Sequence, residues 1–133
     1  MKKGILLTVC MLLLAVNYVM AEGAETNVTV NNVAPTVDFV SITPDDDLAT
    51  AGVQVNVNPG GTKNVIVTAE VSDANEQSDI SLVRAFISGS SVIPQSPVTL
   101  SCSPVDSDTS TCNGQFSLNY TQSAGNYVVS VQA

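Results

Sequence analysis

Short runs of alternating β-branched residues, each ended by proline, glycine or aspartate, dominate the sequence from Pro35 onward. Alternation with a period of two is typical of strands that bury one face, and no stretch sustains a helical period. Strands that recur about every ten residues, with turn signals between them, predict an all-β, antiparallel, two-sheet sandwich over residues 35–133. The expected strands, about seven, are residues 36–43, 53–57, 65–71, 80–87, 98–102, 114–120 and 126–133.

Three details of this pattern have structural consequences. Alternation in residues 36–43 places Val37, Phe39 and Ile42 toward the core. Residues 80–87 also fit a short helix. The acidic triplet at residues 45–47 follows a proline, a context in which aspartate side chains commonly bond the backbone of a turn.

The first 21 residues have the layout of an export signal, which would form a helix ahead of the β domain. Lys2 and Lys3 precede an apolar run over residues 5–20, and Val19 and Ala21 occupy the −3 and −1 positions of a cleavage site. Two alternatives remain open, namely a retained membrane anchor and a pilin-type signal cut after the glycine at position 4. Residues 22–34 are expected to form a polar linker or an edge strand.

Cleavage after residue 21 would leave a strongly acidic chain that suits one domain. Only Lys63 and Arg84 then remain as basic residues against all 12 acidic ones, and the sequence contains no histidine. Such a chain repels nucleic acid and anionic lipid, so neither is an expected partner, and membrane contact is expected only through an uncleaved signal. Without histidine no nucleophile can be paired with an imidazole base, and the protein is not expected to be an enzyme.

Cys102 and Cys112 are the two cysteines that remain after signal removal, and they enclose a polar, turn-rich stretch. In an exported domain such a pair predicts one disulfide that staples a hairpin-like loop. Free thiols are the alternative. Two thiolates without histidine fall short of a structural zinc site.

Several segments together resemble immunoglobulin-like or PKD-like domains of archaeal cell-surface proteins, as in methanogens. They are residues 34–37, 65–75, 78–80, 116–118 and 124–131. The resemblance implies a β-sandwich that serves as a stalk, spacer or adhesive module of the cell envelope. Other envelope proteins or surface glycans would be its partners. The expected location is therefore extracellular or in the cell envelope.

The resemblance also implies a final strand after residues 127–131, and here the chain stops at Ala133. An unfilled position would expose unpaired backbone groups and the apolar residues beneath them. Either the coding region is truncated, or the edge is tolerated, or another strand fills it. The candidate is residues 26–30 of the same or the next subunit, which would make the protein a self-assembling, donor-strand filament subunit.

One metal site and two modification sites are also predicted. Asp73, Asn75, Glu76 and Asp79 place four oxygen ligands near one turn, which suggests calcium as a cofactor of a calcium-dependent binding module. The competing interpretation is a solvated acidic turn whose side chains bond their own backbone, with no cofactor. Asn27 and Asn119 begin sequons and are expected glycan acceptors in a glycosylating host.

Overall fold

The computed structural model describes residues 32–133. The expected signal segment, most of the linker, and the sequon at Asn27 lie outside the described residues. Between residues 32 and 133 no helix has the length and apolar character of a membrane span.

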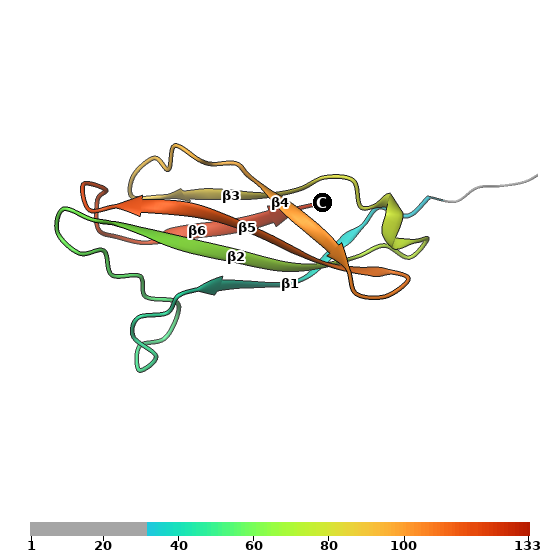
Figure 1. The fold of residues 1–133 in the computed structure, drawn as a ribbon, viewed down its shortest axis with the longest axis horizontal. Coiled ribbons are helices and arrows are strands. Elements are labelled where there is room, and N and C mark those ends of the chain that lie inside the picture. The colour runs from blue at the N-terminus through green and yellow to red at the C-terminus, as the bar shows by residue number, and fades with distance from the viewer. Residues whose placement is uncertain (1–31) are drawn as a thin grey trace, which may run out of the picture. The chain divides into compact units, whose positions relative to one another are not determined.

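Six antiparallel strands and one turn of 3₁₀ helix make up the described domain (Figure 1). The prediction of an all-β antiparallel fold is confirmed. In chain order the elements are β1 (Thr36–Thr43), β2 (Thr62–Ser72), η1 (Gln77–Asp79), β3 (Val83–Gly89), β4 (Val98–Pro104), β5 (Thr109–Asn119) and β6 (Tyr127–Gln132). The stretch over residues 80–87 is thus mainly strand, as predicted, and its alternative as a helix is wrong.

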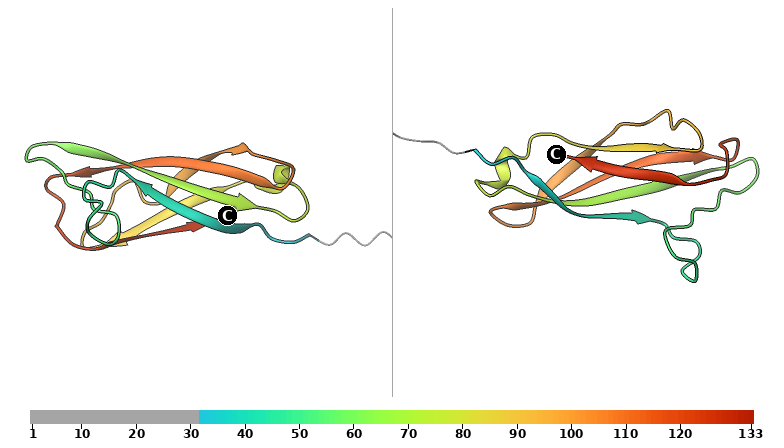
Figure 2. Two further views of the ribbon diagram at one scale, coloured as in Figure 1. Left: turned by 90° about the horizontal axis from the view of Figure 1, so that it is seen from below. Right: turned by 180° about the vertical axis from the view of Figure 1, so that it is seen from behind.

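The six strands join into one nearly closed, barrel-like sheet in the order β1-β2-β5-β4-β3-β6 (Figure 2). β4 makes the connection, because its residues 98–100 pair with β3 and its residues 101–104 pair with β5. Every pairing is antiparallel. The two ends of the order, β1 and β6, form no ladder with each other among the described residues.

The core lies inside this curved sheet and is built mainly from the inward-facing residues of its middle strands, with Ile80 and Ile93 added by connecting segments. In β2 the alternation predicted from the sequence holds, with every second side chain from Val65 to Val71 buried. The buried apolar residues are Val65, Val67, Ala69, Val71, Ile80, Val83, Ala85, Ile87, Ile93, Leu100, Cys112 and Phe116. At Gly114 an added Cβ would lie 2.5 Å from Cδ2 of Leu100, so glycine there makes room for the leucine.

The prediction that Phe39 faces the core is wrong. The β1–β2 register shifts between Val37 and Phe39, which takes Asp38 out of the pairing. This β-bulge turns Phe39 to the outer face, where it lies opposite Glu70 and is 58% exposed. Val37 and Ile42, the other two residues expected in the core, do pack against it.

The expected strand at residues 53–57 is absent, because this extended segment joins no ladder in the described structure.

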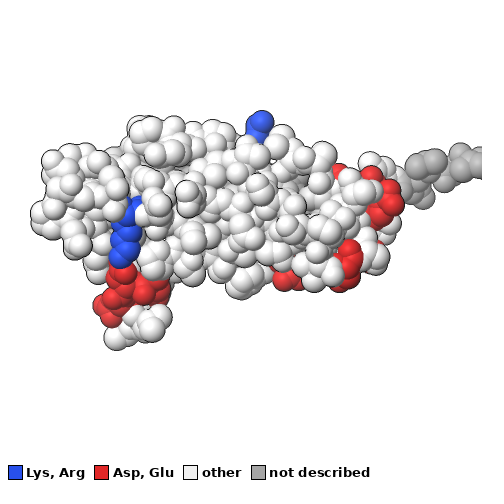
Figure 3. All heavy atoms as spheres, viewed as in Figure 1, with Lys and Arg blue, Asp and Glu red and all other residues white. Residues whose placement is uncertain are grey.

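Acidic side chains gather in the loop after β1 and in the loops at the opposite end of the domain (Figure 3). The face between these two ends carries few charges (Figure 3). Electrostatic recognition would therefore concentrate at the loops rather than on the sheet.

Candidate functional site

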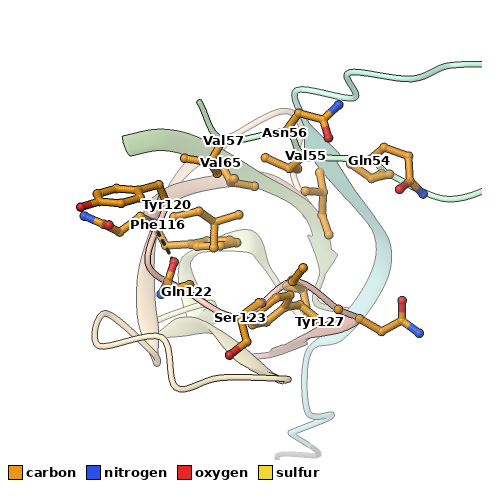
Figure 4. A pocket seen from close by; sticks show the side chains of 18 residues that line it. Gln54, Val55, Asn56, Val57, Val65, Phe116, Tyr120, Gln122, Ser123 and Tyr127 are labelled. Carbon is orange, nitrogen blue, oxygen red and sulfur yellow. Dashed lines mark hydrogen bonds between the residues drawn. The ribbon is translucent and has the colours of Figure 1, made fainter. Parts of the chain in front are cut away.

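A cavity of about 570 Å³ lies at the end of the domain where residues 53–57 meet the start of β6. We call it the end cavity. Figure 4 shows residues 54–57 and the Ser123–Tyr127 region on facing sides of it, with Val65 and Phe116 between them. Its lining comprises Ile42, Val53, Gln54, Val55, Asn56, Val57, Val65, Phe116, Leu118, Asn119, Tyr120, Gln122, Ser123, Ala124, Gly125, Asn126, Tyr127 and Val129. None of these residues is charged.

Two aspartates from the loop after β1 hold the 53–57 wall of the cavity in place. Asp45 Oδ1 accepts the backbone N–H of Gln54 at 3.0 Å, and Asp46 Oδ2 accepts that of Asn56 at 2.6 Å. The N–H of Asp46 donates to the Gln54 carbonyl at 2.7 Å. Carboxylates thus take the bonds that a neighbouring strand would otherwise supply, which is why the expected strand does not form.

Lys63 at the start of β2 forms an ion pair with Asp46. The pKa of Asp46 lies below its ordinary value, chiefly because its carboxylate accepts the Asn56 N–H and secondly because it bonds Lys63. The pKa of Asp47 is also lowered, through bonds from the Thr50 hydroxyl and the Ala49 N–H. All three carboxylates of the acidic triplet thus accept backbone N–H groups, as the sequence pattern predicts. For Asp46 and Asp47 these bonds favour the ionised carboxylate.

The opposite wall is fixed by Tyr127. Its hydroxyl donates to the Ser123 carbonyl at 2.8 Å and shares a hydrogen bond with Ser91 Oγ at 2.5 Å. The Asn119 N–H donates to Oε1 of Gln122 at 2.8 Å and so closes the turn after β5. The result is a preformed hollow with an apolar floor and an amide-rich rim. Such a lining can bind apolar side chains and an extended backbone.

Comparison with protein families, with curated proteins and with solved structures finds no significant match to this chain. The function of the protein is therefore inferred from its own residues and their geometry.

The predicted disulfide is confirmed. Cys102 of β4 and Cys112 of β5 lie directly opposite each other, with their Cα atoms 3.9 Å apart. The loop between the two cysteines is shorter than expected. Both strands continue past the disulfide and leave only residues 105–108 as the turn. The Asp106 carboxylate accepts the N–H groups of Asp108 and Thr109, and its pKa is lowered for that reason.

The four residues predicted to bind calcium lie around the turn between β2 and η1. Asp73 is buried, and its Oδ1 accepts the Asn75 N–H at 2.9 Å, while its other oxygen has no hydrogen-bond partner within residues 32–133. Glu76 and Asp79 are exposed. Within the described residues no group of three or more acidic, histidine or cysteine side chains lies close enough together to hold a metal ion. The bond within the turn fits the backbone-bonding part of the competing interpretation, but Asp73 itself is buried rather than solvated. Calcium stays a prediction.

The sequon at Asn119 lies at the rim of the end cavity. Asn119 is exposed, and its Oδ1 accepts both the N–H and the hydroxyl of Thr121, at 3.0 and 3.1 Å. Glycosylation at this residue remains a prediction. The end cavity itself was not predicted, because its walls come from segments far apart in the sequence and no local pattern marks them.

Proposed function

We propose that this protein is an exported, non-enzymatic structural or adhesive module of the cell surface. The observation that carries the proposal is the Cys102–Cys112 disulfide, which links adjacent strands of a small β domain. Bridges of this kind form and persist in oxidising, extracytoplasmic compartments. The export signal expected over residues 1–21 supports the same location.

The finer fold that we propose is an immunoglobulin-like, PKD-like sandwich. Its two layers would be β1-β2-β5-β4 and β4-β3-β6, the two ladders that share β4. The resemblance to archaeal envelope domains supports this assignment, and such domains present loops and edges to partners. Fold analogy names no ligand, so the partner class, envelope proteins or surface glycans, is part of the proposal.

The chemistry of the end cavity supports a binding role over a catalytic one. Its rim offers amides, and its floor offers the apolar side chains of Val65 and Phe116. The lining has serine and tyrosine hydroxyls but no carboxylate, amine or imidazole to activate them as a base. A site of this kind holds an extended chain or an apolar group without transforming it.

Expression of the full chain with its own leader in an exporting host tests the proposal. We expect the protein outside the cytoplasm, starting at Glu22, with an intact mass about 2 Da below that of the dithiol form. The matched control is the Cys102→Ala/Cys112→Ala variant, which we expect to be exported yet cut faster by added protease. Retention in the cytoplasm with both thiols free would contradict the proposal.

A further inference from the structure

A strip of the core stays uncovered between the free edges of β1 and β6, which lie beside each other (Figure 2). We call it the seam. Val40 of β1 faces Ala69, and Val129 of β6 faces Ile87. Ala69 and Ile87 are buried, whereas Val40 and Val129 are not, although all four point to the inside of the sheet. The inner faces of both edge strands therefore lack a covering layer.

The directions of the two edge strands define what can fill the seam. Strand direction alternates along the order β1-β2-β5-β4-β3-β6, so β1 and β6 run antiparallel to each other. β1 and β6 approach each other more closely than two strands that flank a third, which lie about 10 Å apart. One added strand that separated these edges would therefore pair antiparallel with β6 and parallel with β1. Unpaired N–H and C=O groups on both edges are a ready template for such an addition.

The end cavity continues the seam. Ile42 of β1 and Val129 of β6 line both, and the cavity adds the apolar floor made by Val65 and Phe116. A strand laid in the seam would extend into the cavity and place alternate side chains there. This is the arrangement used in β-strand addition, in which main-chain bonds give affinity and pockets for every second side chain give specificity.

We propose that residues 26–31 of a neighbouring copy fill the seam as a seventh strand, with Val28 and Val30 facing the core. This inference rests on the proposed function, since it names the partner of that surface module as a second copy of the chain. Residues 26–31 alternate and carry no charge, which matches the uncharged lining of the cavity. Asn27 and Thr29 would face outward, where a glycan on Asn27 does not obstruct pairing.

The geometry favours a neighbouring copy over the same chain as the donor. Asn32, where the described chain begins, accepts a hydrogen bond from Asn75 at 2.5 Å, beyond the end of β2 (Figure 1). The end cavity lies at the other end of β2, an 11-residue strand about 36 Å long. In a hairpin that folds back onto β1 from residues 31–35, Val30 would face Thr36 and Val28 would face Asp38. Neither valine would reach the cavity.

Light scattering of the oxidised 22–133 chain over a range of concentrations tests the proposal. We expect concentration-dependent oligomers for the natural sequence and monomers for Val28→Asp/Val30→Asp. The control Asn27→Asp/Thr29→Asp makes the same charge change on the opposite face of the strand and should still associate. A natural sequence that stays monomeric at all concentrations would overturn the proposal. So would a natural sequence that is monomeric and that Val28→Asp/Val30→Asp merely destabilises, because that result indicates insertion of the chain's own segment.

A second measurement keeps the test independent of folding defects. A fluorescein-labelled peptide of residues 22–32 should bind the monomeric Val28→Asp/Val30→Asp protein with one-to-one stoichiometry. Val55→Asp in the cavity wall should weaken this binding about tenfold or more, while Val92→Asp, in an exposed loop outside the cavity, should not. Absence of peptide binding would overturn the strand addition, yet export and disulfide formation would still be judged by the separate localisation experiment.

Discussion

Val40 faces Ala69 across the β1–β2 ladder, and Val40 is 36% exposed although Ala69 is fully buried. Paired residues on the inner face of a sheet normally share one core. Here the sheet stops at β1, so the inner side chains of this strand have a covered side and an open side. The same asymmetry recurs at β6, and it distinguishes the seam from the rest of the interior.

Two matched truncations measure this asymmetry. Val67→Ala removes buried methyl groups and leaves a cavity, so we expect a loss of about 2 kcal/mol in the free energy of unfolding. Val40→Ala removes the same atoms from a half-open position and should cost less than about 1 kcal/mol. Urea titrations give both values. Equal costs would mean that the seam is covered in solution.

Loss of the disulfide should destabilise the domain strongly. The cysteines are separated by 10 positions in the sequence, and closing a loop of that size in the unfolded chain corresponds to about 2–3 kcal/mol. We expect Cys102→Ala/Cys112→Ala to lower the free energy of unfolding by that amount. The urea midpoint of the oxidised protein, measured with and without reductant, provides the check. The Cys102→Ala/Cys112→Ala variant is the control, because its midpoint should not change with reductant.

The acidic turns predict a loss of stability in acid. The pKa values of Asp46, Asp47 and Asp106 lie below the ordinary value of 3.8, because each ionised carboxylate accepts N–H or O–H bonds in the folded state. The unfolded chain therefore binds protons at higher pH than the folded chain does. The stabilisation is fully present above pH 3.8 and is lost as the pH falls through the lower folded-state values.

Unfolding titrations from neutral pH to about pH 3 test this dependence. We expect a nearly constant free energy of unfolding at neutral and mildly acidic pH and a decline below the ordinary aspartate pKa. Asp46→Asn should make that decline shallower, because the amide does not titrate. A loss of stability centred well above pH 5 would point to other groups.

Ser110 is a buried hydroxyl without a hydrogen-bond partner among the described residues, opposite Val71 in the β2–β5 ladder. Burying an unpaired hydroxyl costs free energy, so Ser110→Ala should leave stability unchanged or raise it by about 1 kcal/mol. Ser117→Ala is the control, because the Ser117 hydroxyl donates to Asn64 Oδ1 at 2.7 Å and its loss should destabilise slightly. Destabilisation by Ser110→Ala would indicate a partner such as bound water.

Calcium is expected to leave the melting temperature unchanged. The predicted ligands do not converge in the described structure, and Asp73 already bonds the backbone of its own turn. Calorimetry in calcium and in chelator should give superimposable curves. A calcium-dependent rise that Asp73→Asn or Asp79→Asn abolishes would restore the calcium-dependent binding module as an explanation.

The strands that sequence alone predicted best are those with uninterrupted alternation. Residues 65–71 and 126–133 alternate cleanly because one buried face imposes a period of two. The ladders contain all of the first segment and residues 127–132 of the second. The disulfide between the two cysteines could also be predicted, because their spacing suits the closure of a hairpin. These features depend on local order along the chain.

Other features depend on partners that are remote in sequence. Residues 53–57 alternate as well as any strand does, but carboxylates of Asp45 and Asp46 occupy their backbone donors. Phe39 was misplaced because one bulged residue inverts the faces of the residues after it. The end cavity brings together β1, β2, β5 and β6 with two loops, and periodicity carries no information about such an assembly.

The even number of described strands has a mechanical consequence. Since β1 and β6 run antiparallel, the start of β1 and the end of β6 lie at the same end of the domain. Tension applied between those two points would peel the edge strands away one hydrogen bond at a time. A seventh strand donated by a neighbour and running antiparallel to β6 would instead be pulled along its own length. Its row of bonds would then be loaded together in shear, and a chain of such copies would resist force far better than a single copy.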